Sequence, residues 1–540
     1  MPRHEAARND DCELLVAVLA LLRLPQDEES MGQEDVAAVA AQRRIRTTAK
    51  RIASGAPTDE ASSTSITSNL SALTRLCDNK FLTYSYESIP LVWRSIYIGA
   101  QLLQACHALT AFDLARQGAV LSRCIRDLDL ALIVAGAGST EQGHLCHQII
   151  ASLQAKLLEV DPSCSTQTLR RSSGDRPPRK RSRWAPSDVL SPTACDAIQA
   201  TTPVLDFDFE HAPSFIELAA PDSVLRSKPF VVRSYAQGSG WPAVQPGPDG
   251  PSWSSMQHLL RSAGPARVVP IEVGANYIRN DWGQDVMLWS DFLRQCRWGD
   301  DEVPIGAKDE QAGSADCSNR HMLYMAQYDL ASQFPALESD YVLPDYVFTS
   351  PPPPSEWPTY RPPSTSDGVI NNLWIGPAGT VSPPHYDPFY NCFVQVVGYK
   401  EVWVAPPYCK PSKINRTSEQ ASVFQSCATE TNVSADTDNK GSITESLMAN
   451  TANIDVFDSH EAVPEFVRSA AYKAVLGPGD LLYMPPECCR VGPGKVSESL
   501  PTLTVKHAQT SSSGEGAFAA AITIIDLRVL QLRNSTTLSS

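Results

Sequence analysis

The sequence of 540 residues contains no Cys-x-x-Cys pair, although it has 14 cysteines, and the spacing of these cysteines is irregular. Proteins that depend on a disulfide framework are mostly short secreted chains with cysteines at regular spacings. The pattern therefore argues against a disulfide framework and for a reducing compartment.

A long apolar run near the start is also missing. The longest runs from Leu14 to Leu22, whereas a helix that crosses a bilayer needs about 20 apolar residues. Acidic residues precede the run, at Asp10, Asp11 and Glu13, and a secretion signal begins with positive charge instead. We therefore expect a soluble intracellular protein, nuclear and/or cytoplasmic, with no membrane partner.

The chain has no excess of positive charge. Its formal net charge is −15, and residues 1–200 are balanced, with 22 basic and 22 acidic side chains. Residues 201–540 hold 23 basic and 38 acidic side chains. An acidic surface repels phosphate backbones and attracts basic ligands. We therefore predict no direct nucleic-acid binding by this part of the chain, and a basic protein as its partner. The alternative is that the acidic excess is an ordinary solvated surface.

Composition and hydrophobic periodicity divide the chain into five parts. Proline is frequent, with 42 residues, and its clusters indicate exposed connections between folded parts. The parts that we expect are residues 1–70, mostly disordered with one short helix near 11–24; 71–160, a helical module; 161–202, a basic and proline-rich linker; 203–486, a β-rich domain with an inserted loop at 409–447; and 487–540, an atypical tail.

The helical module is recognised from apolar residues that recur every three or four positions. Pro90 precedes one such run and can open a helix, and the Gly136-Ala137-Gly138 segment interrupts the pattern. No polar cluster is expected inside this module. In the linker that follows, the basic run from Arg176 to Arg183 is typical of a nuclear-import signal.

The pattern becomes that of β-strands after residue 203. Short apolar segments rich in valine and aromatic residues alternate with glycine and proline turns, which predicts a sandwich or barrel. The chain as a whole is therefore predicted to be α+β. The expected strands include Lys228 to Arg233, Arg267 to Gly274, His321 to Gln327, Cys392 to Val397, Val402 to Val404 and Gly479 to Pro485.

The segment that carries chemistry is Ser382-Pro383-Pro384-His385-Tyr386-Asp387. Alternate residues of an extended segment face the same side, so His385 and Asp387 can point at one atom. An imidazole and a carboxylate are two of the three ligands of the facial triad that holds non-haem Fe(II). His385 and Asp387 are therefore the candidate catalytic and metal-binding residues.

Two further polar residues accompany this motif. Lys400 lies on the next segment that reads as a strand, and a cation beside a metal suits the far carboxylate of a dicarboxylate such as 2-oxoglutarate. Asn391 lies between the motif and Lys400 and can donate to the same ligand. The alternative for Lys400 is an ordinary lysine of an edge strand.

The segment from Asn372 to Pro388 resembles the core of the JmjC-domain oxygenases, in the branch of the lysine-specific demethylase 8 type. Other stretches agree in the same order, so that the resemblance covers about 203–486. It implies a double-stranded β-helix of the cupin (jelly-roll) type, Fe(II) as cofactor and 2-oxoglutarate as cosubstrate. It also implies iron ligation by His385 and Asp387, and a cosubstrate pocket formed by Lys400, Asn391, Ser382, Tyr277 and Trp374.

The family requires a third iron ligand, a histidine that comes shortly after the segment ending at Pro485. Arg490 stands where we place that histidine, and arginine has no lone pair to give to iron. The apolar closing strands of the family are also not apparent, since residues 492–540 are rich in Ser, Thr and Gly, with one apolar stretch from Phe518 to Leu532.

Three interpretations of this end remain open. The reading frame or the splicing departs from the family near Glu487; or the chain is a catalytically inactive relative; or His507 supplies the third metal ligand. Cys488 and Cys489 are less suited, because adjacent cysteines are more often structural.

The predicted function is that of an Fe(II)- and 2-oxoglutarate-dependent dioxygenase acting on protein side chains. Both hydroxylation and N-demethylation of basic residues agree with the resemblance, and a histone tail or an arginine-rich protein fits the acidic C-terminal part as substrate. The alternative is a catalytically inactive, cupin-type scaffold that binds proteins.

Overall fold

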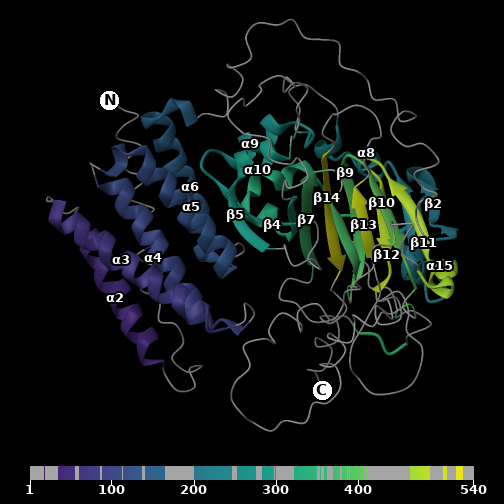
Figure 1. The fold of residues 1–540 in the computed structure, drawn as a ribbon, viewed down its shortest axis with the longest axis horizontal. Helices are drawn as coiled ribbons and strands as arrows, with labels where there is room; N and C mark the ends of the chain where they lie inside the picture. The colour runs from purple at the N-terminus through teal and green to yellow at the C-terminus, as the bar shows by residue number, and fades with distance from the viewer. Residues whose placement is uncertain are drawn as a thin grey trace, which may run out of the picture.

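A computed structural model of the chain describes a helical region and a sheet-rich domain, which lie side by side at the left and right of Figure 1. The residues that it describes are 18, 35–54, 60–84, 88–111, 114–136, 140–164, 200–245, 252–274, 283–296, 298, 322–348, 353, 358–361, 369–377, 380–385, 387, 389–406, 409, 456, 463–486, 503–507 and 518–526. The basic run of the predicted linker and the predicted 409–447 loop, apart from Cys409, lie outside these residues.

The helical region confirms the helices predicted between 71 and 160. Pro90 stands at the N-cap of α4, where its missing N–H breaks no helical hydrogen bond. Gly136 ends α5 in the left-handed conformation, with φ 63°. The helices are α2 (Val36–Ala53), α3 (Glu60–Phe81), α4 (Leu91–Thr110), α5 (Gly118–Ala135) and α6 (Glu141–Val160).

The prediction that residues 1–70 are mostly disordered is wrong for α2 and α3. Together, these two helices are rich in Ala, Ser and Thr, and alanine is the best helix former. Asp35 caps α2 with its carboxylate. The helix expected near 11–24 lies outside the described residues except for Val18, which is helical and buried. The buried face of α2 includes Ala38, Ala41, Ile45, Ala49 and Ile52.

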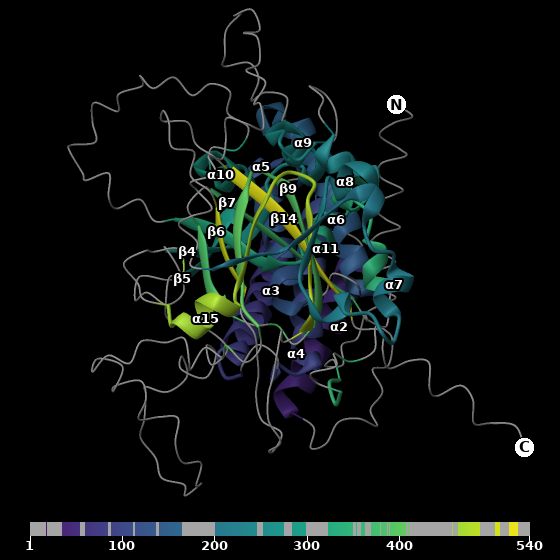
Figure 2. The same ribbon diagram turned by 90° about the vertical axis from the view of Figure 1, so that its right-hand side faces the viewer.

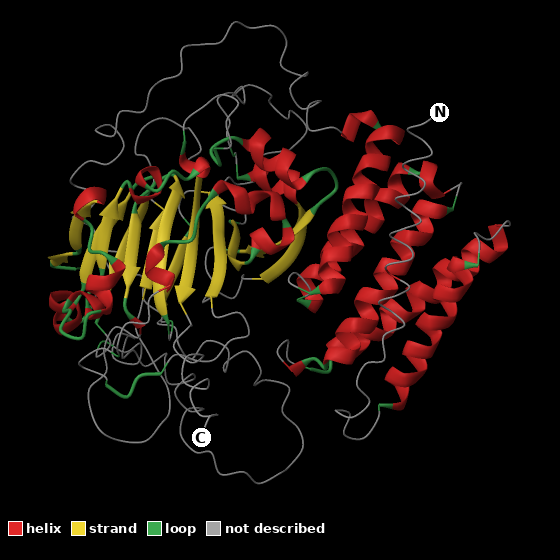
Figure 3. Cartoon of the chain, turned by 180° about the vertical axis from the view of Figure 1, so that it is seen from behind, coloured by secondary structure: helices red, strands yellow, loops and turns green. Residues whose placement is uncertain are grey.

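Two sheets form the core of the second domain, as the yellow strands of Figure 3 show from behind. One has the strand order β1-β11-β10-β13-β8, and the other has the order β2-β3-β12-β9-β14-β7-β6-β4-β5. The strands are β1 (Thr202–Pro203), β2 (Leu205–Asp208), β3 (Phe230–Arg233), β4 (Val268–Val273), β5 (Gly283–Leu288), β6 (Leu323–Tyr328), β7 (Val369–Pro377), β8 (Val381–His385), β9 (Tyr390–Val397), β10 (Lys400–Val404), β11 (Tyr472–Leu476), β12 (Leu481–Met484), β13 (Leu503–His507) and β14 (Phe518–Asp526).

The predicted strands listed above are confirmed, as β3, β4, β6, β9, β10 and β12, and so is the α+β class. Short helices connect the strands. They are α7 (Phe215–Ala219), α8 (Tyr235–Gly238), α9 (Met256–Ala263), α10 (Trp289–Gln295), α11 (Leu330–Gln333) and α15 (Glu465–Ala470), with 3-10 turns at Phe209–His211, Leu225–Ser227, Pro242–Val244, Pro335–Asp340 and Asp345–Phe348. Two further 3-10 turns, Leu114–Arg116 and Pro162–Cys164, lie in the helical region.

The expectation that no closing strands follow residue 487 is wrong for the backbone. β14 pairs with β7 on one side and with β9 on the other, and β13 lies between β10 and β8. Both strands therefore fill interior positions of their sheets. The apolar stretch from Phe518 supplies β14, whereas the polar composition before it concealed β13, because a central position is set by tertiary pairing rather than by propensity.

Apolar side chains of both sheets meet in one cluster between them. Val402 and Ala474 come from the first sheet, and Val231, Phe393 and Leu482 from the second. A larger cluster covers the other face of the second sheet with α9, α10 and several tryptophans. In the first sheet, Trp403 points the opposite way from its neighbours and packs with residues of α15, at the end of the molecule remote from the helical region (Figures 1 and 2).

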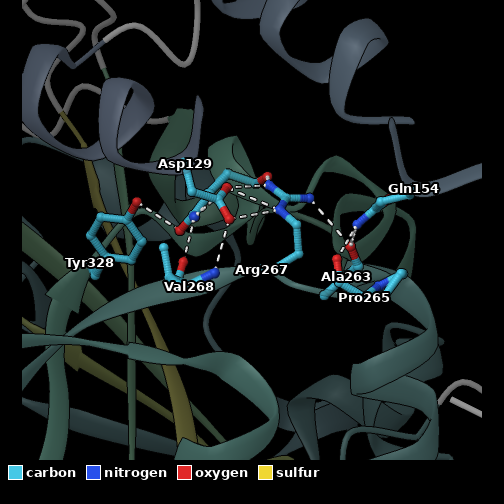
Figure 4. A network of polar contacts seen from close by, with 8 residues as sticks. Asp129, Gln154, Ala263, Pro265, Arg267, Val268 and Tyr328 are labelled. Carbon is cyan, nitrogen blue, oxygen red and sulfur yellow. Dashed lines mark hydrogen bonds and ion pairs between the residues drawn. The ribbon is translucent and has the colours of Figure 1, made fainter. Parts of the chain in front are cut away.

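A buried ion pair joins the two parts of the chain (Figure 4). Asp129 of α5 is 0% exposed, and Arg267, next to β4, is 5% exposed. Arg267 donates to the Asp129 carboxylate from Nε at 2.9 Å and from Nη2 at 2.7 Å. The same carboxylate accepts the Val268 N–H at 2.9 Å and the Gln333 side-chain amide at 2.8 Å. Asp129 thus takes its polar partners from the sheet-rich domain, and this cluster lies between the two parts of the chain, not inside the helical module.

A second contact lies beside this pair. The side-chain amide of Gln154 in α6 donates to the carbonyls of Ala263 and Pro265, each at 3.0 Å. Hydrogen bonds thus join α5 and α6 to the segment that leads into β4. They fix the position of the helical region against the sheet-rich domain. No helix among the described residues is long and apolar enough to cross a membrane.

Replacing Asp129 should destabilise the whole chain. Asp129→Ala leaves the Arg267 guanidinium buried without its carboxylate, which should lower the free energy of unfolding by about 3–5 kcal/mol. Urea unfolding measures this change. The matched control is Asp291→Ala, which breaks the exposed Asp291–Arg294 pair and should cost less than about 1 kcal/mol. Equal losses in the two variants would contradict the role of Asp129.

Candidate functional site

β8 brings the His-x-Asp motif to the edge of the first sheet. His385 is the last residue of the strand, Asp387 follows two positions later, and both residues are partly buried. The Asn391 side-chain amide lies 3.5 Å from Oδ2 of Asp387 and donates to it at the long limit of a hydrogen bond. The structure thus places three of the predicted site residues at the junction of β8 and β9.

Lys400 lies in the space between the two sheets. It begins β10, in which alternate residues Val402 and Val404 belong to the cluster between the sheets, so the three share one face. Its side chain is 1% exposed, and its ammonium lies 4.5 Å from the ring centroid of Phe393. This contact excludes the alternative of an ordinary, solvated edge lysine.

Burial alone perturbs the charge of Lys400. Desolvation lowers the pKa of its ammonium from 10.5 to about 7. The structure shows no ion pair between Lys400 and a carboxylate of the described residues. An amine in this state gains strongly from an anion placed beside it, because the anion restores the charged form. The surroundings therefore suit a carboxylate ligand.

Unsatisfied amide oxygens lie on the same inner face of β9. Asn391 and Gln395 lie two residues before and two residues after Phe393, so the three share one face of the strand. The side-chain oxygens of Asn391 and Gln395 are buried without a hydrogen-bond partner among the described residues. Asn391 is 4% exposed and Gln395 is 0% exposed. Buried polar atoms without partners mark places where a ligand or water is needed. Gln395 was not among the pocket residues predicted from the sequence. Its two-residue spacing from Phe393 in a predicted strand was the available signal, because such residues share one face.

The other predicted pocket residues are placed less completely. Ser382 is buried in β8, and Trp374 is partly buried in β7. Leu373 and Ile375 belong to the cluster that packs with α9 and α10 on the far side of the second sheet. Since neighbouring residues of a strand face opposite sides, Trp374 faces the space between the two sheets. Tyr277 lies outside the described residues, and its role stays a prediction.

The third metal ligand is not found among the described residues, which contain no group of three His, Cys, Asp or Glu side chains able to hold a metal. Arg490, Cys488 and Cys489 lie outside them. In β13, His507 pairs with Lys400, whereas Leu503 pairs with His385. His507 is thus four residues, roughly 13 Å, along the strand from the position opposite His385, which argues against it as the third ligand.

Comparison with known proteins agrees with this arrangement. A model of the cupin-like domain matches residues 217–487. The chain belongs to the cupin-like family, in its JmjC branch. The match includes β8, β9 and β10, so that the His-x-Asp motif and Lys400 lie inside the domain that defines the family.

The JmjC relatives are similar at modest identity. The chain is 33% identical to Jumonji C domain-containing protein 5 of Drosophila melanogaster over 248 residues, 46% of this chain and 47% of that protein. It is 24% identical to lysine-specific demethylase 8 of Danio rerio over 407 residues, 74% of this chain and 78% of that protein. The first alignment thus spans about half the length of the relative.

The unusual charge state of Lys400 should appear in the pH dependence of stability. The folded pKa lies near 7 and the unfolded pKa near 10.5, so between these values the unfolded chain binds more protons and stability rises with pH. Relative to Lys400→Met, the unchanged chain should therefore become more stable as the pH rises from 7 towards 10. Urea unfolding at several pH values measures the difference. Lys156→Met, at an exposed position of α6, is the control and should show no such trend.

Proposed function

We propose that this chain is a JmjC oxygenase whose pocket takes Fe(II) at His385 and Asp387 and 2-oxoglutarate at Lys400. The observation that carries the proposal is the fully buried Lys400, which has no anionic partner among the described residues and lies between the sheets on β10, two strands from β8 in the first sheet. A dicarboxylate satisfies this ammonium with its far carboxylate. The imidazole and carboxylate of the motif are donors that suit Fe(II).

Lys400 and Asn391 have different roles in the proposed binding site. Lys400 holds the far carboxylate, and its ammonium is restored to the charged form by that contact. Asn391 bonds to Asp387 through its amide N–H and has its oxygen free for a donor, so it orients the motif from inside the barrel. When bound, Fe(II) and 2-oxoglutarate supply the oxidation of a C–H bond by dioxygen, and the barrel supplies their positions.

The proposed substrate is a basic protein side chain. Residues 201–540 carry the whole acidic excess of the chain, which attracts a basic peptide. Three of the relatives are named lysine-specific demethylases, so N-demethylation of lysine in a histone tail is one candidate reaction. Hydroxylation of a basic side chain in an arginine-rich protein is the other, and both require the same site. A nuclear and/or cytoplasmic location is proposed on the basic linker.

A second candidate function is that of a binding scaffold without catalysis. The observation that favours it is the lack of a third metal donor among the described residues. In this case the cupin domain binds a basic peptide, and the pocket residues serve only to hold a small acid or to stabilise the fold.

The proposal predicts that binding of 2-oxoglutarate depends on Lys400. Loss of a buried partner of a charged pair costs at least about 2 kcal/mol, so Lys400→Met should bind 2-oxoglutarate about 30-fold more weakly or worse. Calorimetric titration of the full chain measures the affinity. Lys473→Met, in the neighbouring strand β11, is the matched control and should bind as the unchanged chain does.

A succinate-release assay with basic peptides then separates the two candidate functions. Release that requires His385 and Asp387 supports the oxygenase, and binding of 2-oxoglutarate without release supports the scaffold. If the unchanged chain does not bind 2-oxoglutarate at all, the proposed pocket is wrong.

A further inference from the structure

We infer that position 503 is where a third metal donor stands in this barrel, and that Leu503 leaves the chain with a site of two donors. Such a site retains the acid-binding part of the pocket but holds a divalent metal weakly. This inference rests on the proposed function, which it deepens by naming the residue that limits metal binding.

The pairing of β13 with β8 identifies the position. Leu503 is opposite His385, and Val505 is opposite Ser382, so β8 holds one extra residue between the two pairs. An extra residue of this kind bends a strand and re-aims its end, and such bulges are frequent beside active sites. The irregularity therefore lies directly before His385, at the end of β8 that carries the motif.

Among the residues of β13, position 503 has the backbone nearest to the motif. Residues directly opposite in an antiparallel pair have Cα atoms about 4.5–5.5 Å apart. On the other side of β13, Val404 is the partner of Leu503, and Lys400 is the partner of His507. The strand thus runs from the proposed metal at one end to the proposed acid-binding lysine at the other.

The type of residue at this position decides what the site holds. Leucine has no donor atom for a metal. The facial arrangement that binds Fe(II) needs two histidines and a carboxylate, and β13 offers a histidine only at the Lys400 end. The pocket for the acid depends on β9 and β10 and is unaffected. The chain should therefore bind 2-oxoglutarate but hold metal with low affinity.

The experiment is a titration of the full chain with Mn(II), alone and with 2-oxoglutarate, comparing four proteins. Loss of outer partners of a metal site costs about 10–100-fold in affinity, and a direct donor should matter at least as much. Leu503→His should therefore bind Mn(II) about 100-fold more tightly than the unchanged chain. Arg490→His and His507→Ala should bind Mn(II) as the unchanged chain does.

Other outcomes overturn the inference. A gain in Arg490→His without a gain in Leu503→His moves the third position to 490, and weaker binding in His507→Ala makes His507 a ligand. Tight Mn(II) binding by the unchanged chain, equal to that of Leu503→His, shows that a donor is already present.

A second variant keeps the test decisive if Leu503→His does not fold, as circular dichroism would show. Leu503→Cys is smaller and places a thiolate at the same position, so Co(II) should produce a thiolate charge-transfer absorption that disappears when His385→Ala is added. Absence of this absorption in the folded variant contradicts the inference.

Binding of 2-oxoglutarate without metal, measured on the same samples beside Lys400→Met, tests the proposed function separately. If the acid binds through Lys400 and position 503 has no effect on metal, only the inference fails. If 2-oxoglutarate does not bind, the proposed function is wrong as well as the inference about position 503.

Discussion

The buried pair of Asp129 and Arg267 is the interaction that makes the two halves of this chain one structure. The Asp129 carboxylate accepts from a guanidinium, a backbone N–H and a side-chain amide, which come from two separate segments of the sheet-rich domain. Two charges removed from water are tolerated only when their hydrogen bonds are satisfied in this way. The arrangement therefore fixes α5 against the start of β4, and through β4 and β6 it supports β7 of the second sheet.

Burial of the Lys400 ammonium between the two sheets lowers the stability of the folded chain. Here the buried ammonium has no carboxylate partner among the described residues, and burial lowers its pKa. A protein selected only for stability gains from an apolar residue at such a position. A lysine there, with unsatisfied amide oxygens of Asn391 and Gln395 on the facing strand, is the arrangement expected where a ligand completes the hydrogen bonds. The cost in stability and the proposed binding of an acid thus have the same origin, the buried ammonium of Lys400.

How far the fold could be predicted depended on the kind of signal. β9 and β10 were found because short apolar runs between turns have few alternatives, and α4 to α6 because their apolar residues recur at helical spacing. α2 was missed because its buried face consists largely of alanine, which reads as low complexity. β13 was missed because it is only five residues long, Leu503 to His507, within a polar stretch, and its pairing with β8 and β10 makes it a strand.

The class of the protein, the His-x-Asp motif and the order of the residues proposed to bind an acid could be read from the sequence, because these depend on residue type and on spacing within one segment. The folded structure was needed to show that Lys400 is buried between two sheets, that Asp129 is paired with a residue 138 positions away, and that Leu503 stands opposite His385. These facts depend on which distant strands and helices become neighbours, and such pairing follows from the packing of the whole domain rather than from any local pattern.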